Sequence, residues 1–238
     1  MTRRLAIIPA RGGSKRIPRK NLRDFAGRPA FTHILSAAAA SEMFDVIHVS
    51  TDDESIAQAA ALAGFPPGFE RDIALADDFT PIRSVVSWTL RQYAERGEVF
   101  DTIALLYATA FFVTPAVLAR ACALFETGDR SQPILGVVDV GTPMEKLFTV
   151  EDGLLKTVDA ARFGARTQDL TPIWRDAGTF GIFDAKTLLD DADGAAPLAF
   201  RPFALDPWIG IDIDTEDDWA FAERLYRGNY DIDEKDGA

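Results

Sequence analysis

Apolar residues along the chain fall into two kinds of segment that alternate. Short runs of four to six residues, with the length and branching of buried strands, are followed by stretches with helical periodicity. This alternation predicts an α/β fold in which a mostly parallel sheet is flanked by helices. The predicted strands cover residues 5–8, 46–50, 103–107, 134–138, 179–183 and 200–205, and the predicted helices cover residues 32–40, 55–63, 83–96, 114–125, 185–189 and 215–227.

The alternation is interrupted between residues 141 and 175, where prolines and glycines break the pattern. Residues 146–150 and 154–158 alternate between apolar and polar side chains on either side of Glu151-Asp152-Gly153. This pattern predicts a β-hairpin. Two strands cannot bury an apolar face by themselves, so we expect this inserted arm to pack on a second copy of the chain.

Length and composition are typical of one enzyme-sized domain. With 238 residues, 47% of them hydrophobic, the chain can bury a full core. We expect residues 1–230 to form one domain that carries the arm, and residues 231–238 to form a flexible polar tail. The formal net charge of −12 leaves no broad basic face. It therefore argues against nucleic acid as a partner.

The number of cysteines and the residues before the first predicted strand give information on the cellular location. Cys122 is the only cysteine, which excludes an internal disulfide and a thiolate metal cluster. It lies in a predicted helix, where a buried thiol is favoured over a nucleophile. The residues before the first strand include no apolar signal segment, and no apolar run reaches membrane-spanning length. We expect a cytoplasmic protein that makes no membrane contact.

Residues 10–21 have the most distinctive local chemistry. The first strand ends at Pro9, and the glycines Gly12 and Gly13 allow backbone amides to approach an anion because no Cβ is in the way. Neither the P-loop spacing nor the dinucleotide-binding spacing is present. A plain exposed basic loop is the alternative. The combination of a preceding strand, two glycines and several cations favours a polyphosphate-binding loop at the carboxyl end of the strand. Five cations lie in this segment: Arg11, Lys15, Arg16, Arg19 and Lys20.

Two carboxylates near the other end of the chain form the second candidate site. Asp212 and Asp214 are separated by one residue at the end of a strand-like run, which predicts that both project from one face. Converging carboxylates repel unless a cation binds them, and Mg²⁺ is the natural choice. The alternative is a solvated acidic turn before the last helix. Because the carboxyl ends of parallel strands meet at one edge, we expect the aspartates to face the basic loop.

A phosphate-binding loop opposite a carboxylate-bound metal is an arrangement suited to nucleotidyl transfer. A bound hydroxyl attacks the α-phosphate in line while charge on the departing pyrophosphate is stabilised. Positioning and electrostatics are sufficient, so no side-chain nucleophile is required. His33 and His48 lie in a predicted helix and a predicted strand, where core or surface roles are favoured over catalysis.

The motifs also resemble those of a known family. Residues 8–15, Ile-Pro-Ala-Arg-Gly-Gly-Ser-Lys, followed by Pro18, Lys20 and Asn21, resemble the opening motif of the CMP-sialic acid synthetases, also called acylneuraminate cytidylyltransferases. The resemblance continues through residues 50–53, 106–110 and 211–215 and so covers nearly the whole chain. It implies a Rossmann-like sheet of the nucleotide-diphospho-sugar transferase type, and a homodimer that exchanges the arm.

The resemblance also implies roles for individual residues. Nucleotide-binding positions are occupied by Arg11, Ser14, Lys20, Asn21 and Arg71, metal-binding positions by Asp212 and Asp214, and positions near the sugar by Tyr107, Gln168 and Phe180. The predicted substrate-binding set also includes Gly12, Gly13, Lys15 and Asp78, and the predicted catalytic residues are Arg11, Lys20 and Asp214.

An acidic nine-carbon sugar further requires a cation for its carboxylate. Lys146 and Arg166 in the arm are the candidates for this role. A plain surface location is the alternative for Arg166.

Within this family the second half of the chain is most similar to the pseudaminic acid cytidylyltransferases, through residues 166–170 and 176–178 and through Tyr107. We therefore expect an Mg²⁺-dependent enzyme that converts CTP and pseudaminic acid to CMP-pseudaminic acid and pyrophosphate. The hydroxyl proton goes to a metal-bound hydroxide or to Asp214, and the sequence leaves both open. Legionaminic, sialic or 3-deoxy-octulosonic acid remain alternative substrates.

Three departures from the family pattern leave one further alternative. Pro81 and Ile82 replace small hydroxyl residues, Ala-Thr-Ala-Phe at 108–111 replaces a proline-containing segment, and Arg175 replaces a common histidine. A nucleotide-sugar binding protein with impaired catalysis would also fit the first two of these changes. An NAD-dependent oxidoreductase is disfavoured because the glycine spacing of that class is missing.

Overall fold

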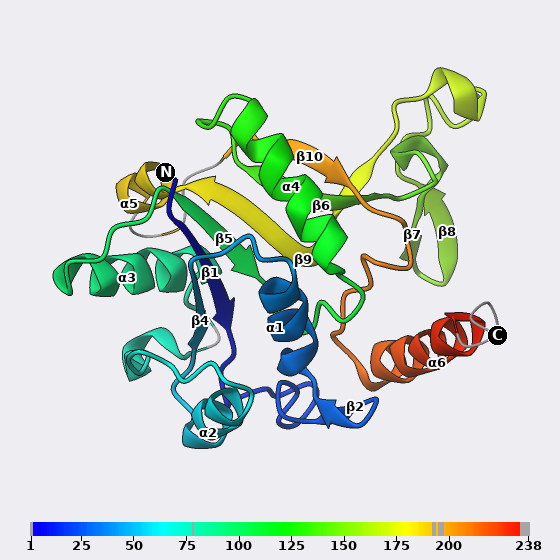
Figure 1. Ribbon diagram of the computed structural model, residues 1–238. Coiled ribbons are helices and arrows are strands. Elements are labelled where there is room, and N and C mark those ends of the chain that lie inside the picture. Colours follow the sequence, from blue (N-terminus) through cyan, green and yellow to red (C-terminus); the bar gives the residue numbers. More distant parts are fainter. Residues whose placement is uncertain (1, 78, 192–193, 195–197, 234–238) are drawn as a thin grey trace.

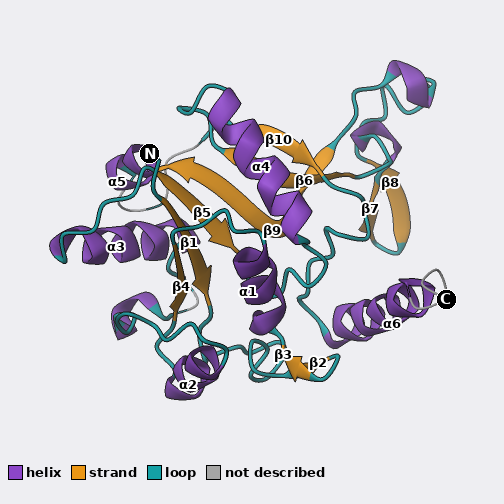
Figure 2. Cartoon of the chain, viewed as in Figure 1, coloured by secondary structure: helices purple, strands orange, loops and turns teal. Residues whose placement is uncertain are grey.

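The computed structural model describes residues 2–77, 79–191, 194 and 198–233. A central sheet of six strands in the order β10-β6-β9-β5-β1-β4 runs through the molecule, with helices packed on both of its faces (Figures 1 and 2). The strands are β1 Arg4–Pro9, β4 Val46–Ser50, β5 Thr102–Leu106, β6 Ile134–Asp139, β9 Trp174–Asp184 and β10 Arg201–Ala204.

The predicted mostly parallel sheet is confirmed. β1 is parallel to β4 and β5, and β10 is parallel to β6. β9 is inserted antiparallel between β5 and β6, and it begins earlier than residue 179, where the sequence pattern placed it. Its first residues, Trp174, Arg175 and Asp176, are exposed and two of them are charged, so apolar periodicity does not reveal them. This arrangement brings the start of β9 to the edge of the sheet where the parallel strands end.

Alternation along the strands sends side chains into two cores. In β1, Ala6 and Ile8 belong to the core under one layer of helices, and Leu5 and Ile7 belong to the core on the opposite face. The first layer contains α1 Phe31–Ala40, α2 Glu54–Leu62, α4 Pro115–Thr127 and the start of α6 Glu216–Asp233, and the second contains α3 Ile82–Glu95 and α5 Ala185–Asp190. Buried Cys122 belongs to the first core, as predicted.

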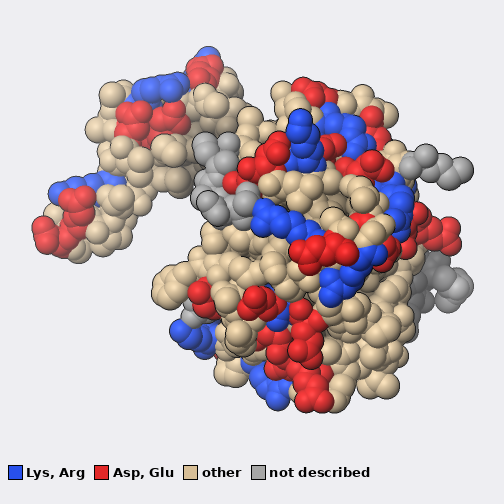
Figure 3. All heavy atoms as spheres, turned by 90° about the vertical axis from the view of Figure 1, so that its left-hand side faces the viewer, with Lys and Arg blue, Asp and Glu red and all other residues tan. Residues whose placement is uncertain are grey.

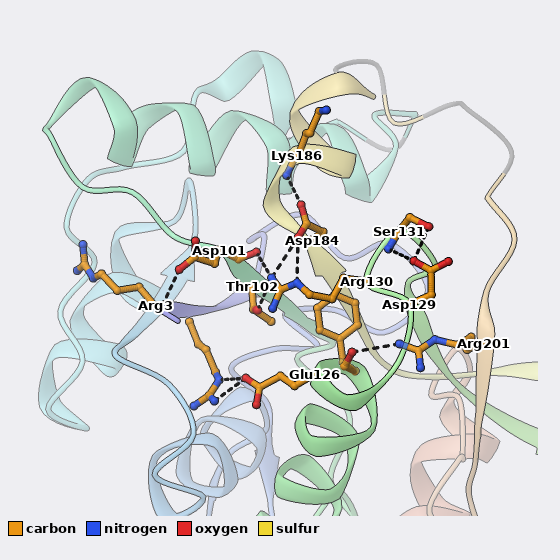
Figure 4. Close-up of polar contacts among 12 residues, drawn as sticks. Arg3, Asp101, Thr102, Glu126, Asp129, Arg130, Ser131, Asp184, Lys186 and Arg201 are labelled. Carbon is orange, nitrogen blue, oxygen red and sulfur yellow. Dashed lines mark hydrogen bonds and ion pairs between the residues drawn. The ribbon is translucent and has the colours of Figure 1, made fainter. Parts of the chain in front are cut away.

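A group of charged residues closes the amino-terminal edge of the sheet (Figure 4). The Arg130 guanidinium donates hydrogen bonds to Asp184 Oδ2 from Nε and Nη2, at 3.2 and 3.1 Å. It also donates to the Asp101 carbonyl at 2.9 Å. Asp184 in turn accepts a hydrogen bond from the Lys186 amide at the start of α5. These contacts join β5, β9 and α5 at the edge opposite the basic loop.

The predicted hairpin is present as a separate two-stranded sheet that projects from the body of the molecule (Figure 1). It pairs β7 Phe148–Glu151 with β8 Leu154–Thr157. Asp152 and Gly153 have φ angles of 52° and 76°, the left-handed conformations that a tight type I′ turn requires. Val150, Leu154 and Leu155 are each about two-thirds exposed. The hairpin therefore presents apolar side chains that its own chain does not cover.

Two boundaries near the carboxyl terminus differ from the predictions. Residues 208–214 form no strand, so the two aspartates are placed by an irregular segment instead of by strand alternation. The last helix extends to Asp233, beyond the predicted end at residue 227, and includes the start of the predicted tail. Residues 234–238 of that tail lie outside the described residues. The predicted cap is confirmed, because Thr215 and Asp218 exchange hydrogen bonds between side chain and amide.

Both histidines are buried, which decides between the core and surface roles that the sequence left open. His48 is 1% exposed and its Nδ1 lies 3.1 Å from the Tyr93 hydroxyl. Burial, and next the charge of Arg71, lower the pKa of His48 to about 4. Burial likewise lowers the pKa of His33 to about 4. Neither histidine takes part in the candidate site described below.

Acid is therefore expected to destabilise the fold before carboxylates titrate. The unfolded chain binds a proton at each histidine near pH 6.5 and the folded chain does not, so stability is lost as the pH falls below 6.5. For His48 this amounts to about 2 kcal/mol by pH 5. Urea unfolding at pH 7.5, 6 and 5 measures it. His48→Gln should weaken this dependence, and an unchanged dependence in that variant would contradict the assignment.

Candidate active site

The loop that follows β1 is held at both ends by hydrogen bonds to backbone carbonyls. The Ala10 amide donates to the Ser50 carbonyl at 2.9 Å, which joins the loop to β4. The buried Asn21 side chain donates from Nδ2 to the Arg11 carbonyl, also at 2.9 Å, and closes the loop on itself. Asn21 is therefore a residue that shapes the loop, in addition to its predicted place beside the nucleotide.

The two glycines of the loop serve different purposes. A Cβ at Gly12 would lie 2.4 Å from Asp53 Oδ2, so only glycine fits against this side chain. Asp53 accepts hydrogen bonds from the amides of Ser55 and Ile56, which caps α2. A Cβ at Gly13 would meet nothing within 4 Å. Gly12 therefore seats the loop on the start of α2, and Gly13 leaves open space above the backbone.

The basic loop and the aspartates meet, as predicted. Arg16 Nη1 lies 2.8 Å from Asp214 Oδ2, and Lys20 Nζ lies 3.9 Å from Asp214 Oδ1. Lys20 also donates to the Ile213 carbonyl at 2.6 Å. A cavity of about 360 Å³ opens between the two groups. Its lining residues are Arg11, Ser14, Lys15, Arg16, Lys20, Asn21 and Asp214.

Charges in this cavity influence one another strongly. Burial lowers the pKa of Lys20, while Asp214 and Asp212 act in the opposite direction. Burial raises the pKa of Asp212, and repulsion from Asp214 adds to the increase. The charge of Asp214 therefore disfavours the charged form of Asp212. Such a pair gains from a divalent cation.

The donor set fits Mg²⁺. Asp212 and Asp214 supply oxygen ligands, and Mg²⁺ commonly takes one or two carboxylates together with substrate phosphates and water. No group of three or more His, Cys, Asp or Glu arranged to hold a metal occurs among the described residues. An ion at this position would therefore be completed by substrate oxygens.

Arg71 lies behind the loop. It is buried, and its guanidinium donates to the side chain of Ser50 at 3.1 Å and to the Ser50 carbonyl. Burial lowers its pKa to about 10, with Asp52 opposing and Arg11 adding to the change. Asp52 has one carboxylate oxygen that is buried without a hydrogen-bond partner in the described part of the chain. Asp52 was not among the predicted site residues, although residues 50–53 belong to the motifs that resemble the family.

A second group of residues lies beside Asp212. The pKa of Tyr107 is raised to about 12 by burial, then by the charges of Asp176 and Asp212. Tyr107 follows β5, and its amide donates to the Thr179 carbonyl of β9 at 2.9 Å. Tyr107 thus lies within electrostatic range of Asp176 and Asp212, and its place near the sugar stays a prediction. Asp176 was not among the predicted site residues, and the structure adds it.

Arg175 holds the segment that carries the aspartates. Its Nη2 donates to the Gly210 carbonyl at 2.6 Å. A Cβ at Gly210 would lie 2.3 Å from Val138 Cγ2 and 2.9 Å from Ala177 Cβ, so this segment packs directly on the sheet. Close packing and this hydrogen bond replace the strand pairing that the sequence suggested. Arg175 had been noted only as a departure from the family pattern.

Several predicted site residues lie elsewhere. Phe180 is 0% exposed and packs against Phe203, so the prediction that it contacts the sugar is wrong; strand alternation turns it into the core. In the arm, Lys146 donates to the carbonyls of Phe163 and Ala165, and Arg166 pairs with Asp169 at 3.0 Å. Gln168 lies on the same exposed turn, between Thr167 and Asp169. Asp78 lies outside the described residues.

Two further features of the structure concern surface charge and the character of the helices. Acidic and basic side chains are interspersed on the face shown in Figure 3, which presents no continuous basic surface. Within the described ranges, the helices lack the combination of length and apolar character needed to cross a membrane.

Comparison with known proteins adds to this geometry. The sequence model of a family described as Cytidylyltransferase matches residues 5–120. A pseudaminic acid cytidylyltransferase of Campylobacter jejuni is 34% identical over 232 residues, which cover 95% of this chain and 97% of the relative. A CMP-N,N'-diacetyllegionaminic acid synthase of Legionella pneumophila is 29% identical over 94% of this chain and 97% of the relative.

Solved structures show the same fold. A CMP:2-keto-3-deoxy-manno-octonic acid synthetase complexed with CTP superposes with a TM-score of 0.72, at 14% identity, over 96% of this chain and 100% of the other. A 4-diphosphocytidyl-2C-methyl-D-erythritol synthase gives a TM-score of 0.69 at 15% identity, over 94% and 99% of the two chains.

Proposed function

The chain belongs to the cytidylyltransferase family, and on this premise we propose that it joins CMP from CTP to a nonulosonic acid, with pseudaminic acid as the preferred sugar. The observation that carries the proposal is the contact of Arg16 and Lys20 with Asp214 across the cavity. It brings a phosphate-binding loop and a carboxylate pair to one place. The similarity to a pseudaminic acid cytidylyltransferase over 95% of the chain supports the choice of sugar.

In the proposed reaction, the triphosphate occupies the cavity between the loop and Asp214. Arg11, Lys15 and Lys20 line this cavity and would stabilise negative charge on the phosphates. The anomeric hydroxyl of the sugar forms a new bond to the α-phosphorus, and the bond from the α-phosphorus to the bridging oxygen of pyrophosphate breaks. The hydroxyl proton passes to water or to Asp214. Both substrates are held in place, so no covalent enzyme intermediate is needed.

A divalent cation fits this proposal. Asp212 and Asp214 would hold Mg²⁺, which when bound neutralises phosphate charge and orients the α-phosphate. Burial, and next repulsion from Asp214, raise the pKa of Asp212, and holding the ion would relieve the repulsion. The proposed use of CTP, together with a single buried thiol, would fit a cytoplasmic location.

Pyrophosphate release tests the reaction. The purified protein is assayed with Mg²⁺ and with CTP, ATP, GTP or UTP, each combined with pseudaminic, legionaminic, sialic or 3-deoxy-octulosonic acid. We expect turnover with CTP and the highest kcat/KM with pseudaminic acid. Higher kcat/KM with another acid would reassign the sugar. CTP binding by calorimetry without turnover on any sugar would identify a binding protein instead.

We further propose that the arm forms a homodimer. The exposed apolar residues Val150, Leu154 and Leu155 of the hairpin need a partner surface, and a second copy would supply it. An exchanged arm would bring Arg166 and Gln168 toward the sugar bound by the other copy.

Measuring the oligomeric state tests the proposal that the arm forms the dimer contact. Leu154→Asp combined with Leu155→Asp is expected to convert a dimer to a monomer in analytical ultracentrifugation, because two charges cannot be buried in an apolar contact. Leu62→Asp, at a leucine on α2 that is 90% exposed, is the control and should remain dimeric. A wild-type protein that sediments as a monomer at all concentrations would contradict the proposal.

A further inference from the structure

Packing contacts with the sheet fix the position of the aspartate pair, because residues 208–214 form no strand. Gly210 packs directly on the sheet, as described above. Two residues further along, the side chain of Asp212 lies against Gly178 of β9. A Cβ at Gly178 would lie 3.0 Å from Asp212 Oδ1 and 3.1 Å from Asp212 Cγ. The Asp212 carboxylate therefore occupies the space that a side chain at position 178 would fill.

Gly178 belongs to an irregular stretch of β9. The pairing of β9 with β6 shifts in register between Leu135 and Val137, as it does at a β-bulge. The Gly178 amide donates to Asp176 Oδ1 at 2.8 Å, and Gly178 has a φ of 61°. This angle lies in the left-handed region that favours glycine. The bulge therefore turns the backbone of β9 so that it faces the aspartate segment without a side chain.

The same local turn occurs at the end of β6, but without an aspartate packed against its glycine. The Gly141 amide donates to Asp139 Oδ1 at 2.8 Å, and Gly141 has a φ of 72°. A Cβ at Gly141 would meet nothing within 4 Å. The turn alone therefore accounts for a glycine at position 141. At position 178 the contact with Asp212 is an additional reason for glycine.

The exact position of the Asp212 carboxylate matters for a magnesium site. Mg²⁺ requires near-octahedral geometry with ligand oxygens at about 2.0–2.1 Å. Residues that hold a metal ligand in place therefore influence metal affinity without contacting the ion. Asp212 is partly open to solvent, so a group placed at position 178 would push its side chain aside and leave the backbone in place.

We propose that Gly178 is a positioning residue for the cation site, because it leaves the space in which the Asp212 carboxylate is held for Mg²⁺. This inference rests on the proposed function, in which Asp212 and Asp214 hold the ion beside the triphosphate. Gly178 has no side chain with which to bind the ion, so it acts through Asp212. A side chain at position 178 displaces the carboxylate, weakens cation binding and leaves the basic loop unchanged.

Two alanine variants of the matched turns test the proposal. Gly178→Ala is expected to raise the Mg²⁺ concentration for half-maximal pyrophosphate release by roughly 10-fold, the effect of disturbing a residue that holds a metal ligand. Gly141→Ala should keep the wild-type value. Both variants should lower the melting temperature similarly, because each forces alanine into a left-handed conformation. Gly178→Asn, in which this conformation costs less, should show the same Mg²⁺ effect with a smaller loss of stability.

Binding of Mn²⁺ in the presence of CTP and without sugar, followed by electron paramagnetic resonance, gives the same comparison without turnover. In an Asp212→Ala background, Gly178→Ala should weaken Mn²⁺ binding no further, because the carboxylate through which it acts is gone. A further loss in that background would overturn the proposal, as would equal Mg²⁺ requirements in Gly178→Ala and Gly141→Ala. Pyrophosphate release without any divalent cation would overturn it and leave cytidylyl transfer intact. A wild-type protein that binds Mn²⁺ with CTP but releases no pyrophosphate would instead refute the proposed function, and Mn²⁺ binding by the two variants would still decide the role of Gly178.

Discussion

Asp214→Asn is expected to lower kcat for pyrophosphate release by about 10²- to 10³-fold, the range found when a group that stabilises transition-state charge is removed. Asp214 is in contact with Arg16 and Lys20 and lines the proposed triphosphate cavity. Its carboxylate would also hold the cation. Without it, the loop cations are less neutralised and attract CTP at least as well. The loss should therefore appear in kcat, with KM for CTP unchanged or lower.

Asp217→Asn is the matched control for this experiment. Asp217 lies in the first turn of α6, is exposed, and is three residues from Asp214. It should keep nearly full activity and a similar melting temperature. Two outcomes would contradict the role of Asp214 in catalysis. In the first, Asp214→Asn lowers kcat by no more than a few-fold. In the second, Asp217→Asn lowers kcat as much as Asp214→Asn does.

Lys20→Met is expected to lower kcat/KM for CTP by about 10²- to 10³-fold. The ammonium group is partly buried, with a side chain 22% exposed, and lies between the loop and Asp214. A charge in such a place acts on phosphate more strongly than one in water. Methionine keeps the length of the apolar stem but cannot neutralise charge. Because burial already disfavours the charge, folding should be little affected, which circular dichroism and thermal unfolding can verify.

Lys186→Met provides the comparison. Lys186 is exposed at the opposite edge of the sheet, near Asp184 and Arg130 (Figure 4). The two variants carry the same chemical change and the same change in net charge. Equal effects on kcat/KM would show that overall charge, and not the position of Lys20, governs CTP binding.

The strands and helices could be predicted from the sequence where burial makes apolar residues recur at the spacing of a strand or a helix. β1, β4, β5 and β6 are short apolar runs buried on both faces, and such runs are visible without tertiary information. β9 was predicted too short, since Arg175 and Asp176 are polar and Gly178 interrupts its apolar pattern. Its place between β5 and β6 depends on pairing partners that are far away in sequence.

The basic loop and the aspartate pair of the candidate site could be predicted from the sequence, but several contacts of individual side chains could not. The glycines and cations of the loop are contiguous, so their chemistry can be read from residues 10–21. The meeting of Lys20 with Asp214 followed from the rule for the edges of parallel sheets. The burial of Phe180 and the contact of Arg175 with Gly210 could not be predicted, because each depends on the direction of one side chain in an assembled sheet.

The distance in sequence between the two halves of the site has a consequence for synthesis on the ribosome. Lys20 contacts the Ile213 carbonyl across 193 positions. A nascent chain that ends before residue 212 already contains the basic loop but lacks Asp212 and Asp214, which face it. Such an intermediate would present uncompensated positive charge to every polyanion in the cell. Tight and selective nucleotide capture is therefore a property acquired late, after translation has passed the last strand.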